Sequence, residues 1–121
     1  MTTRKQGPAA RLRIILGAAI AMGPGKADLL EGISDTGSIA AAGRRMGMSY
    51  KRAWMLVETM NACFAKPLVE AAKGGKRGGG ARLTPLGAEM LARYRRMQKE
   101  SGRAIATDLA AMARAMRKRP K

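Results

Sequence analysis

Apolar residues recur at steps of three and four along much of the chain, the spacing of an amphipathic helix. Two such stripes lie close together in its centre: Ile39, Ala42 and Met46, then Ala53, Val57 and Met60. Ser38 and Ser49 each precede one stripe and can cap a helix, while Gly47 between the stripes permits a tight turn. Two short helices joined by a glycine-containing turn form a helix-turn-helix unit.

The second of these helices carries an unusual set of residues outside its apolar stripe: Tyr50, Lys51, Arg52, Trp54 and Met55. Such side chains suit contacts with phosphates, sugars and base edges. No acid occurs from Thr36 through Val57, whereas Arg44 and Arg45 add to the basic residues of this window. The window therefore predicts a DNA-reading element. For Trp54, contact with DNA and packing against a neighbouring hairpin are equally compatible with the sequence.

A helix over about 24–35 is predicted before this unit, with Leu29, Leu30 and Ile33 as its buried stripe. Pro24 suits the first position of a helix, and Gly37 suits its end. Asp28 and Glu31 lie in the first two turns, where carboxylates favour the helix dipole.

Two short strand candidates follow the helix-turn-helix, at 68–73 and 81–84, separated by a glycine-rich basic loop. This pattern predicts a β-hairpin, or wing. From Ala71 through Ala88 there is again no acid, and four basic residues fall in the window: Lys73, Lys76, Arg77 and Arg82. Near the other end, residues 11–16 and 20–22 are strand candidates, with Gly17 as the bend between them. Residues 1–10 form a polar arm.

A long final helix is predicted from Thr84, a cap, and Pro85, at the first helical position. Its stripe runs through Leu86, Met90, Tyr94, Met97, Ile105, Leu109, Met112 and Met116. Ser101 and Gly102 are expected to kink the helix or to weaken it. The first half would pack on the body, whereas the second half extends past it. We expect a second copy of the chain to cover that half as a two-fold helix pair.

The charge points to a polyanionic partner. In 121 residues there are 24 Lys and Arg against 8 Asp and Glu, a net charge of +16. Leaving out the six basic residues of the two tails reduces 24 to 18 and keeps an excess of ten on the body. Nucleic acid is favoured over an anionic membrane surface. A protein acting at a membrane surface through its basic last helix remains a weaker alternative.

An enzyme is not indicated. The chain has no histidine and a single cysteine, Cys63, so it lacks the commonest general base, an internal disulfide and a cysteine-rich zinc site. The glycine-rich loop does not follow the Walker pattern. We expect no cofactor, no metal and no identifiable small-molecule ligand. A rival interpretation takes residues 14–22 as part of a short secretory signal, but this run is weakly apolar and a helix-turn-helix follows it. We expect a cytoplasmic protein, and no stretch approaches transmembrane length.

Several runs together resemble a known family: 29–31, 36–39, 47–54, Asn61, and the glycine-rich 73–84. They are similar to the N-terminal DNA-binding domain of ModE-type molybdate-responsive regulators, and the helix-turn-helix is also similar to that of LysR-type regulators. The resemblance covers roughly residues 10–100. It implies a winged helix-turn-helix that dimerises through N- and C-terminal helical elements and binds a two-fold operator. Molybdate-sensing members carry a C-terminal oxyanion-binding module, and the chain ends where that module would begin, so no molybdate site is carried over.

The sequence thus predicts a mainly α protein with a small β-hairpin: a flexible arm (1–10), a winged helix-turn-helix domain (11–100), and a C-terminal dimerisation helix with a basic tail (101–121). We expect a dimeric, sequence-specific transcriptional regulator with its recognition helix, about 49–63, in the major groove of double-stranded DNA. The wing, 73–82, would lie on the backbone or in the minor groove. The alternative is an architectural DNA-binding protein with little sequence preference. The candidate DNA-binding residues are Ser38, Arg44, Arg45, Ser49, Tyr50, Lys51, Arg52, Trp54, Lys73, Lys76, Arg77 and Arg82.

Overall fold

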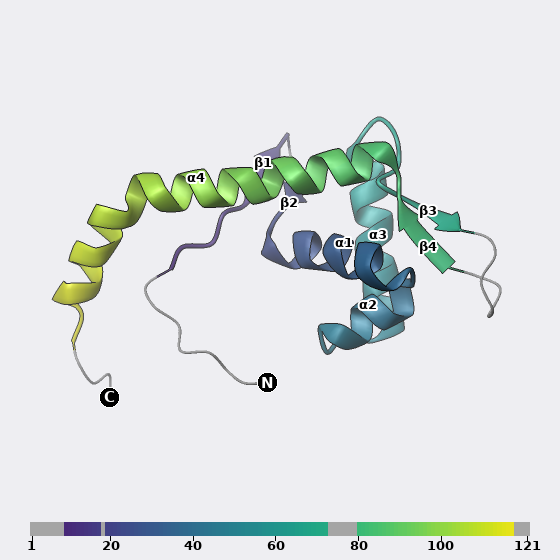
Figure 1. The fold of residues 1–121 in the computed structure, drawn as a ribbon, viewed down its shortest axis with the longest axis horizontal. Coiled ribbons are helices and arrows are strands. Elements are labelled where there is room, and N and C mark those ends of the chain that lie inside the picture. The colour runs from purple at the N-terminus through teal and green to yellow at the C-terminus, as the bar shows by residue number, and fades with distance from the viewer. Residues whose placement is uncertain (1–8, 18, 73–79, 118–121) are drawn as a thin grey trace.

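Helices dominate the computed structural model, which describes residues 9–17, 19–72 and 80–117. In chain order the elements are β1 (Ile14–Leu16), β2 (Ala19–Met22), α1 (Pro24–Thr36), α2 (Ile39–Arg45), α3 (Tyr50–Cys63), β3 (Val69–Ala72), β4 (Gly80–Leu83) and α4 (Pro85–Ala115). Helices α1, α2 and α3 form a body beside the first half of α4, and the β3–β4 hairpin projects from one end of it (Figure 1). The predicted fold, a mainly α winged helix-turn-helix with a long last helix, is confirmed.

The helix boundaries follow from cap chemistry. The hydroxyl oxygen of each predicted cap accepts a backbone N–H three residues further on: Ser38 from Ala41 at 3.0 Å, Ser49 from Arg52 at 3.1 Å, and Thr84 from Gly87 at 2.9 Å. Each cap satisfies a donor that the first turn of a helix leaves without an intrahelical partner. Helix α1 begins at Pro24 and ends at Thr36, and Gly37, the residue that caps it, has a left-handed φ of 75°.

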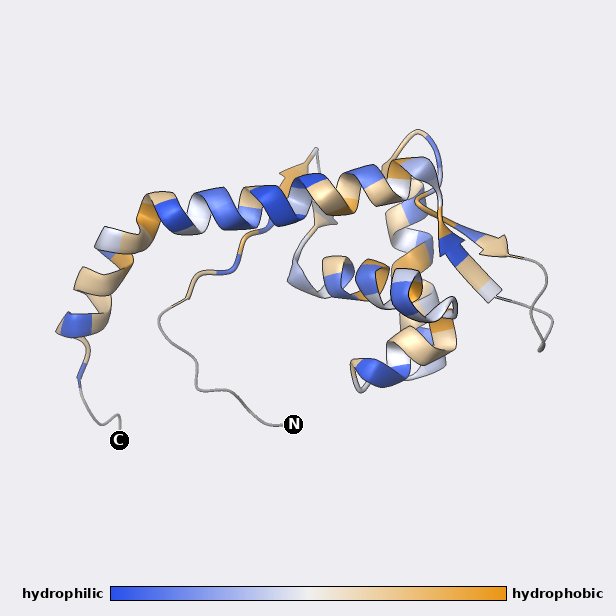
Figure 2. Cartoon of the chain, viewed as in Figure 1, coloured by the Kyte–Doolittle hydropathy of each residue, from blue (hydrophilic) through white to orange (hydrophobic). Residues whose placement is uncertain are grey.

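The core lies between α1, α2, α3 and the start of α4. Every residue predicted for the stripes of α1 and α3 is buried: Leu29, Leu30, Ile33, Ala53, Val57 and Met60. Ala42 is the fully buried residue of the α2 stripe, and Ile39 and Met46 pack against the core while partly exposed. Figure 2 shows hydrophobic and hydrophilic segments interleaved along these helices, as amphipathic packing requires.

Helix α2 is packed closely between its two neighbours. A β-carbon placed on Gly32 of α1 would lie 2.9 Å from the β-carbon of Ala42, and one on Gly43 of α2 would lie 3.0 Å from that of Ala53. Contacts this short leave no room for a methyl group. The absence of a side chain at Gly32 and Gly43 therefore sets how closely the three helices approach.

Both predicted hairpins are present, each as a separate antiparallel sheet. Strand β1 pairs with β2 and starts at Ile14, three residues later than residues 11–16 suggested. In the second hairpin Val69 lies opposite Leu83, and the pairing continues without a bulge to Ala72 and Gly80. The backbone N–H of Ala81 donates a 3.0 Å hydrogen bond to the carbonyl oxygen of Gly37, which ties strand β4 to the turn before α2.

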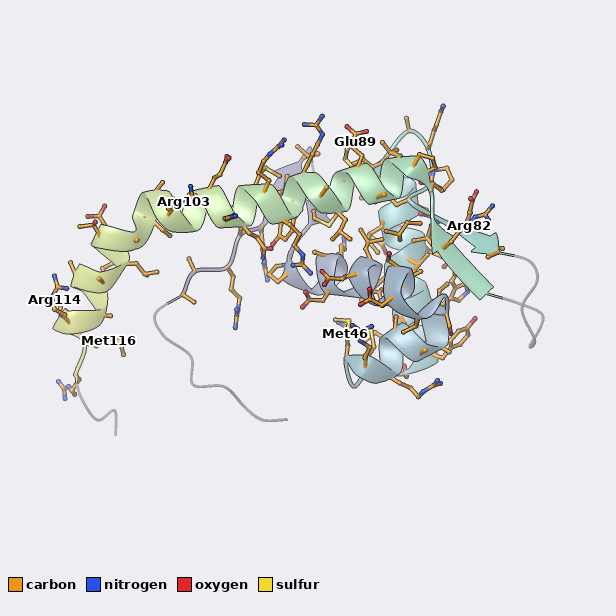
Figure 3. The ribbon with its side chains drawn as sticks, viewed as in Figure 1. Met46, Arg82, Glu89, Arg103, Arg114 and Met116 are labelled. Carbon is orange, nitrogen blue, oxygen red and sulfur yellow. The ribbon has the colours of Figure 1, made fainter. Side chains whose placement is uncertain are left out.

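Helix α4 packs on the body only along its first half. Leu86, Met90 and Leu91 pack against the core and Tyr94 is buried. The helix is continuous through Ser101 and Gly102, where the sequence predicts a kink or a weakened turn. Its axis bends further on, between Arg103 and Arg114 (Figure 3). Its second half extends away from the body, as predicted (Figure 1). Within the described ranges, no helix has both the length and the apolar character needed to cross a membrane.

Candidate nucleic-acid interface

The N-terminal half of α3 presents the face that the sequence predicts. Tyr50, Trp54 and Met55 keep 58%, 42% and 54% of their surface exposed, and Lys51 and Arg52 beside them are also exposed. The opposite face of the helix is buried through Ala53, Val57 and Met60. Three large exposed side chains therefore lie beside two cations on one helix, the arrangement that the sequence predicts for a contact surface.

The turn before α3 fixes how this face is presented. Gly47 has a φ of 72°, a left-handed conformation that side-chain-bearing residues rarely adopt. The backbone N–H of Met48 donates a 2.9 Å hydrogen bond to the carbonyl oxygen of Gly43, which closes the turn at the end of α2. Only three residues, 46–48, therefore separate the end of α2 from Ser49, the cap of α3.

The candidate cations fall into two groups according to their partners. In the described part of the chain, Arg44, Lys51 and Arg52 make no ion pair, whereas Nη2 of Arg45 lies 2.9 Å from Oδ2 of Asp35. Likewise, Nε of Arg82 lies 2.9 Å from Oε2 of Glu70. The acid-free windows do not reveal these two partners, because Asp35 and Glu70 each come one residue before a window begins. The hairpin register, which places Glu70 opposite Arg82, is the signal that could have found the second pair.

The remaining candidates differ in what the structure says of them. Ser38 and Ser49 use their hydroxyl oxygens as helix caps, which leaves each hydroxyl proton to donate elsewhere. Trp54 is not among the side chains that pack against the core. Lys73, Lys76 and Arg77 lie outside the described residues.

Asn61 and Thr84 organise the connection from α3 to the wing, and residue patterns alone had not given Asn61 a role. Oδ1 of Asn61 accepts the N–H groups of Leu68 and Val69 at 2.8 and 3.1 Å, and Nδ2 donates to the carbonyl oxygen of Val69 at 3.1 Å. The Thr84 hydroxyl donates to the carbonyl oxygen of Pro67 at 2.8 Å. These bonds fix the direction in which β3 leaves the end of α3.

A second polar cluster joins α4 to α1. Nη2 of Arg95 lies 2.9 Å from Oδ1 of Asp28 and 2.6 Å from Oε1 of Glu31. Asp28 and Glu31, expected to act on the helix dipole, are therefore also partners of a distant arginine. Burial of the guanidinium lowers the pKa of Arg95, but its hydrogen bonds to these carboxylates outweigh burial and raise the pKa overall.

The neighbouring Tyr94 joins α4 to the N-terminal segment. Its hydroxyl donates a 2.6 Å hydrogen bond to the carbonyl oxygen of Leu12. Burial of the ring raises the pKa of Tyr94 above 10.0, although the positive charge of Arg95 acts in the opposite direction. Elsewhere in the described residues, Cys63 is a free thiol and no three His, Cys, Asp or Glu side chains gather as a metal site.

Comparison with known proteins finds ModE and Mop proteins similar to this chain, although no family model matches it. The molybdenum-pterin-binding protein MopB of Rhodobacter capsulatus is 53% identical over 73 residues, 60% of this chain and 27% of MopB. The molybdenum transport protein ModE of Azotobacter vinelandii is 37% identical over 91 residues, 75% of this chain and 34% of that protein. The transcriptional regulator ModE of Yersinia pestis is 44% identical over 71 residues, 59% and 27% of the two chains. The resemblance to ModE-type proteins is confirmed.

The chain spans between a quarter and a third of the length of these ModE-type relatives. Among solved structures, the CbnR DNA-binding domain in complex with DNA has a similar fold, with a TM-score of 0.56 at 24% identity. The match covers 72% of this chain and 94% of the CbnR chain. It supports the winged-helix fold.

Proposed function

We propose that this protein is a dimeric, sequence-specific DNA-binding transcriptional regulator and not an enzyme. Helix α3 would enter the major groove, and the wing, 73–82, would lie on the backbone or in the minor groove. The observation that carries this proposal is the exposed face of α3, where Tyr50 and Lys51 follow the helix-turn-helix turn directly. In this motif the N-terminal residues of the second helix are the ones that contact base edges.

The net charge of the chain and the names of its relatives both support DNA as the partner. A net charge of +16 favours a polyanion, since cations that neutralise phosphates release condensed counterions. The ModE protein of Yersinia pestis is named a transcriptional regulator, and the CbnR domain was solved bound to DNA. On this basis three arginines would contact the DNA phosphates and so orient the protein: Arg44, Arg45 and Arg52. Three residues of α3 would contact the major groove: Tyr50, Lys51 and Trp54.

The projecting half of α4 supports a dimer. Met112 and Met116 are 70% and 65% exposed, and Ile105 is 37% exposed. A groove of about 700 Å³ runs along this half of the helix, with Ile105 and Leu109 on one side and Ala9, Ala10 and Leu12 on the other. An uncovered apolar surface of this kind is costly in water. A second copy, related by a two-fold axis, would cover both the groove and the helix, so that residues 101–121 serve as the dimerisation segment.

The groove assignment is tested with DNA sites selected from a random pool, using Lys51→Ala and the matched control Lys99→Ala. Both changes remove one exposed positive charge, but Lys99 lies on α4 and not on α3. We expect Lys51→Ala to lower the preference for selected over random DNA by about 1–3 kcal/mol. Lys99→Ala should weaken binding to both alike, if at all. An unchanged preference in Lys51→Ala would overturn the recognition-helix assignment, and a wild type without any preference would favour the architectural alternative.

The dimer is tested by light scattering at micromolar concentration. The wild type should have twice the 12.9 kDa mass of the chain, and Met112→Glu should dissociate it by placing a charge in the apolar seam. A monomeric wild type would overturn this part of the proposal.

A further inference from the structure

Arg95 lies at the place where α4 leaves the body. Immediately before it, Tyr94 is 1% exposed and bonded to the N-terminal segment. Beyond it, every side chain from residue 103 to residue 108 is exposed. Figure 3 shows the helix continuing past Arg103 with no other element beside its far end. The contacts at Arg95 therefore lie at the joint between a packed half-helix and a projecting one.

The geometry at Arg95 differs from that of a second arginine on the same helix. Arg93 pairs with Glu89 one turn away at 2.8 Å, so this pair stays within α4, and its side chain is 56% exposed. Arg95 instead reaches two acids of α1, at 2.9 and 2.6 Å, and is 34% exposed. A planar guanidinium held by two carboxylates on another helix restricts direction as well as distance.

We propose that Arg95 is a positioning residue that fixes the angle between α4 and the body, and thereby sets the spacing of DNA half-sites. This inference rests on the proposed function, since it requires a dimer that reads DNA with two copies of α3. If the projecting half of α4 holds the second copy, the angle at this joint determines how far apart the two recognition helices lie.

The length of the helix makes the joint sensitive. From Arg95 to Ala115, at about 1.5 Å per residue, α4 extends roughly 30 Å. A rotation of about 10° at the joint would move its far end by roughly 5 Å. That displacement exceeds the rise of about 3.4 Å between successive base pairs. A preference for one half-site spacing therefore requires that the joint be held, and Arg95 with its two acids is a polar contact that joins α4 to α1 at this point.

The test compares Arg95→Met with Arg93→Met, which removes the same charge from the same helix. Affinity is measured at fixed salt for duplexes whose two selected half-sites are moved apart in single base-pair steps. For the wild type and Arg93→Met we expect a shift of one base pair from the best spacing to weaken binding by roughly tenfold, because half-site separation is a geometric requirement. For Arg95→Met the same shift should cost about threefold or less, with unchanged affinity for an isolated half-site.

A second variant covers the case in which Arg95→Met folds poorly. Asp28→Ala combined with Glu31→Ala removes both acceptors of Arg95 from α1 and leaves α4 unaltered, and it should relax the spacing preference equally. If either folded variant kept a preference as sharp as that of the wild type, the inference would be overturned while the proposed function stood. A wild-type dimer that bound all spacings alike would overturn it too. A wild type that failed to bind DNA would overturn both.

Discussion

Glu70 and Arg82 face each other across the β3–β4 ladder, with Nε of the arginine 2.9 Å from Oε2 of the glutamate. Both side chains are substantially exposed, at 42% and 66%, so the pair contributes at most about 1 kcal/mol to stability. Its larger consequence is electrostatic, because a carboxylate neutralises one cation of the proposed DNA-binding wing.

Glu70→Gln should therefore strengthen binding to random DNA. The change frees Arg82 for phosphate, and the salt dependence of the affinity should steepen by up to about one unit. Titration of a random duplex over a range of salt concentrations measures both effects. Glu89→Gln is the control, because it frees Arg93 in the same way. Glu89 lies on the side of α4 turned away from α2 (Figure 3). Equal gains in the two variants would mean that only net charge matters and that Arg82 makes no special contact.

Gly32→Ala should destabilise the fold. The new β-carbon would lie 2.9 Å from that of Ala42, so α1 and α2 would have to move apart, at a cost of about 1–3 kcal/mol. The matched change Gly102→Ala, in open space within α4, should instead stabilise by up to about 1 kcal/mol. Urea unfolding measures both. A Gly32→Ala protein as stable as the wild type would show that the two helices can separate without loss.

Asn61→Ala should weaken the attachment of the wing to α3. Removing the amide leaves the N–H groups of Leu68 and Val69 without their acceptor, a loss of about 2–4 kcal/mol in unfolding free energy. Thr59→Ala is the control, since its hydroxyl bonds only within α3 and is exposed. Chemical denaturation measures the unfolding free energy of both variants. If the two substitutions lowered it equally, the Asn61 side chain would not hold the connection between α3 and β3.

Tyr94 should make the stability of the protein fall at alkaline pH. Burial raises its folded-state pKa above 10.0, so its contribution is complete below pH 10 and is lost as the pH rises through the folded pKa. Tyr94→Phe should remove this part of the pH dependence. Tyr94→Phe should also lower the free energy of unfolding by about 1 kcal/mol at neutral pH, because the hydrogen bond to the carbonyl oxygen of Leu12 is lost. The measurement is the free energy of urea unfolding at each pH from about 8 to about 11. If this free energy changed with pH in the same way in the wild type and in Tyr94→Phe, the prediction would be contradicted.

The sequence predicted those parts of the fold that depend on neighbours along the chain. Helical spacing placed Val57 and Met60 inside and Tyr50 outside, and the caps at Ser49 and Thr84 followed from the chemistry of a helix start. These features need only a few consecutive residues, so a single sequence contains them. The outward face of α3, the centre of the candidate site, was predictable for this reason.

The partners of the charged residues were not predictable in the same way. Arg95 meets Asp28 and Glu31 more than sixty positions away, which depends on how α1 and α4 cross. Arg45 meets Asp35 because α2 folds back on the end of α1. Acid-free windows count residues along the chain, whereas an ion pair depends on distance in space. The bend of α4 beyond Arg103, and not at Gly102, likewise has no local sequence signal.

The small residues between α1, α2 and α3 allow the three helices to pack closely against one another. Gly32 brings α1 close to Ala42 of α2, and Gly43 of α2 lies close to Ala53 on the buried face of α3, so the small residues lie on the inner side of α3. Evolution or a designer can therefore exchange the outward side chains of α3, and so change the sequence that is read, while the scaffold stays as it is. The packing of α3 against α2 is therefore independent of the residues that would read the DNA.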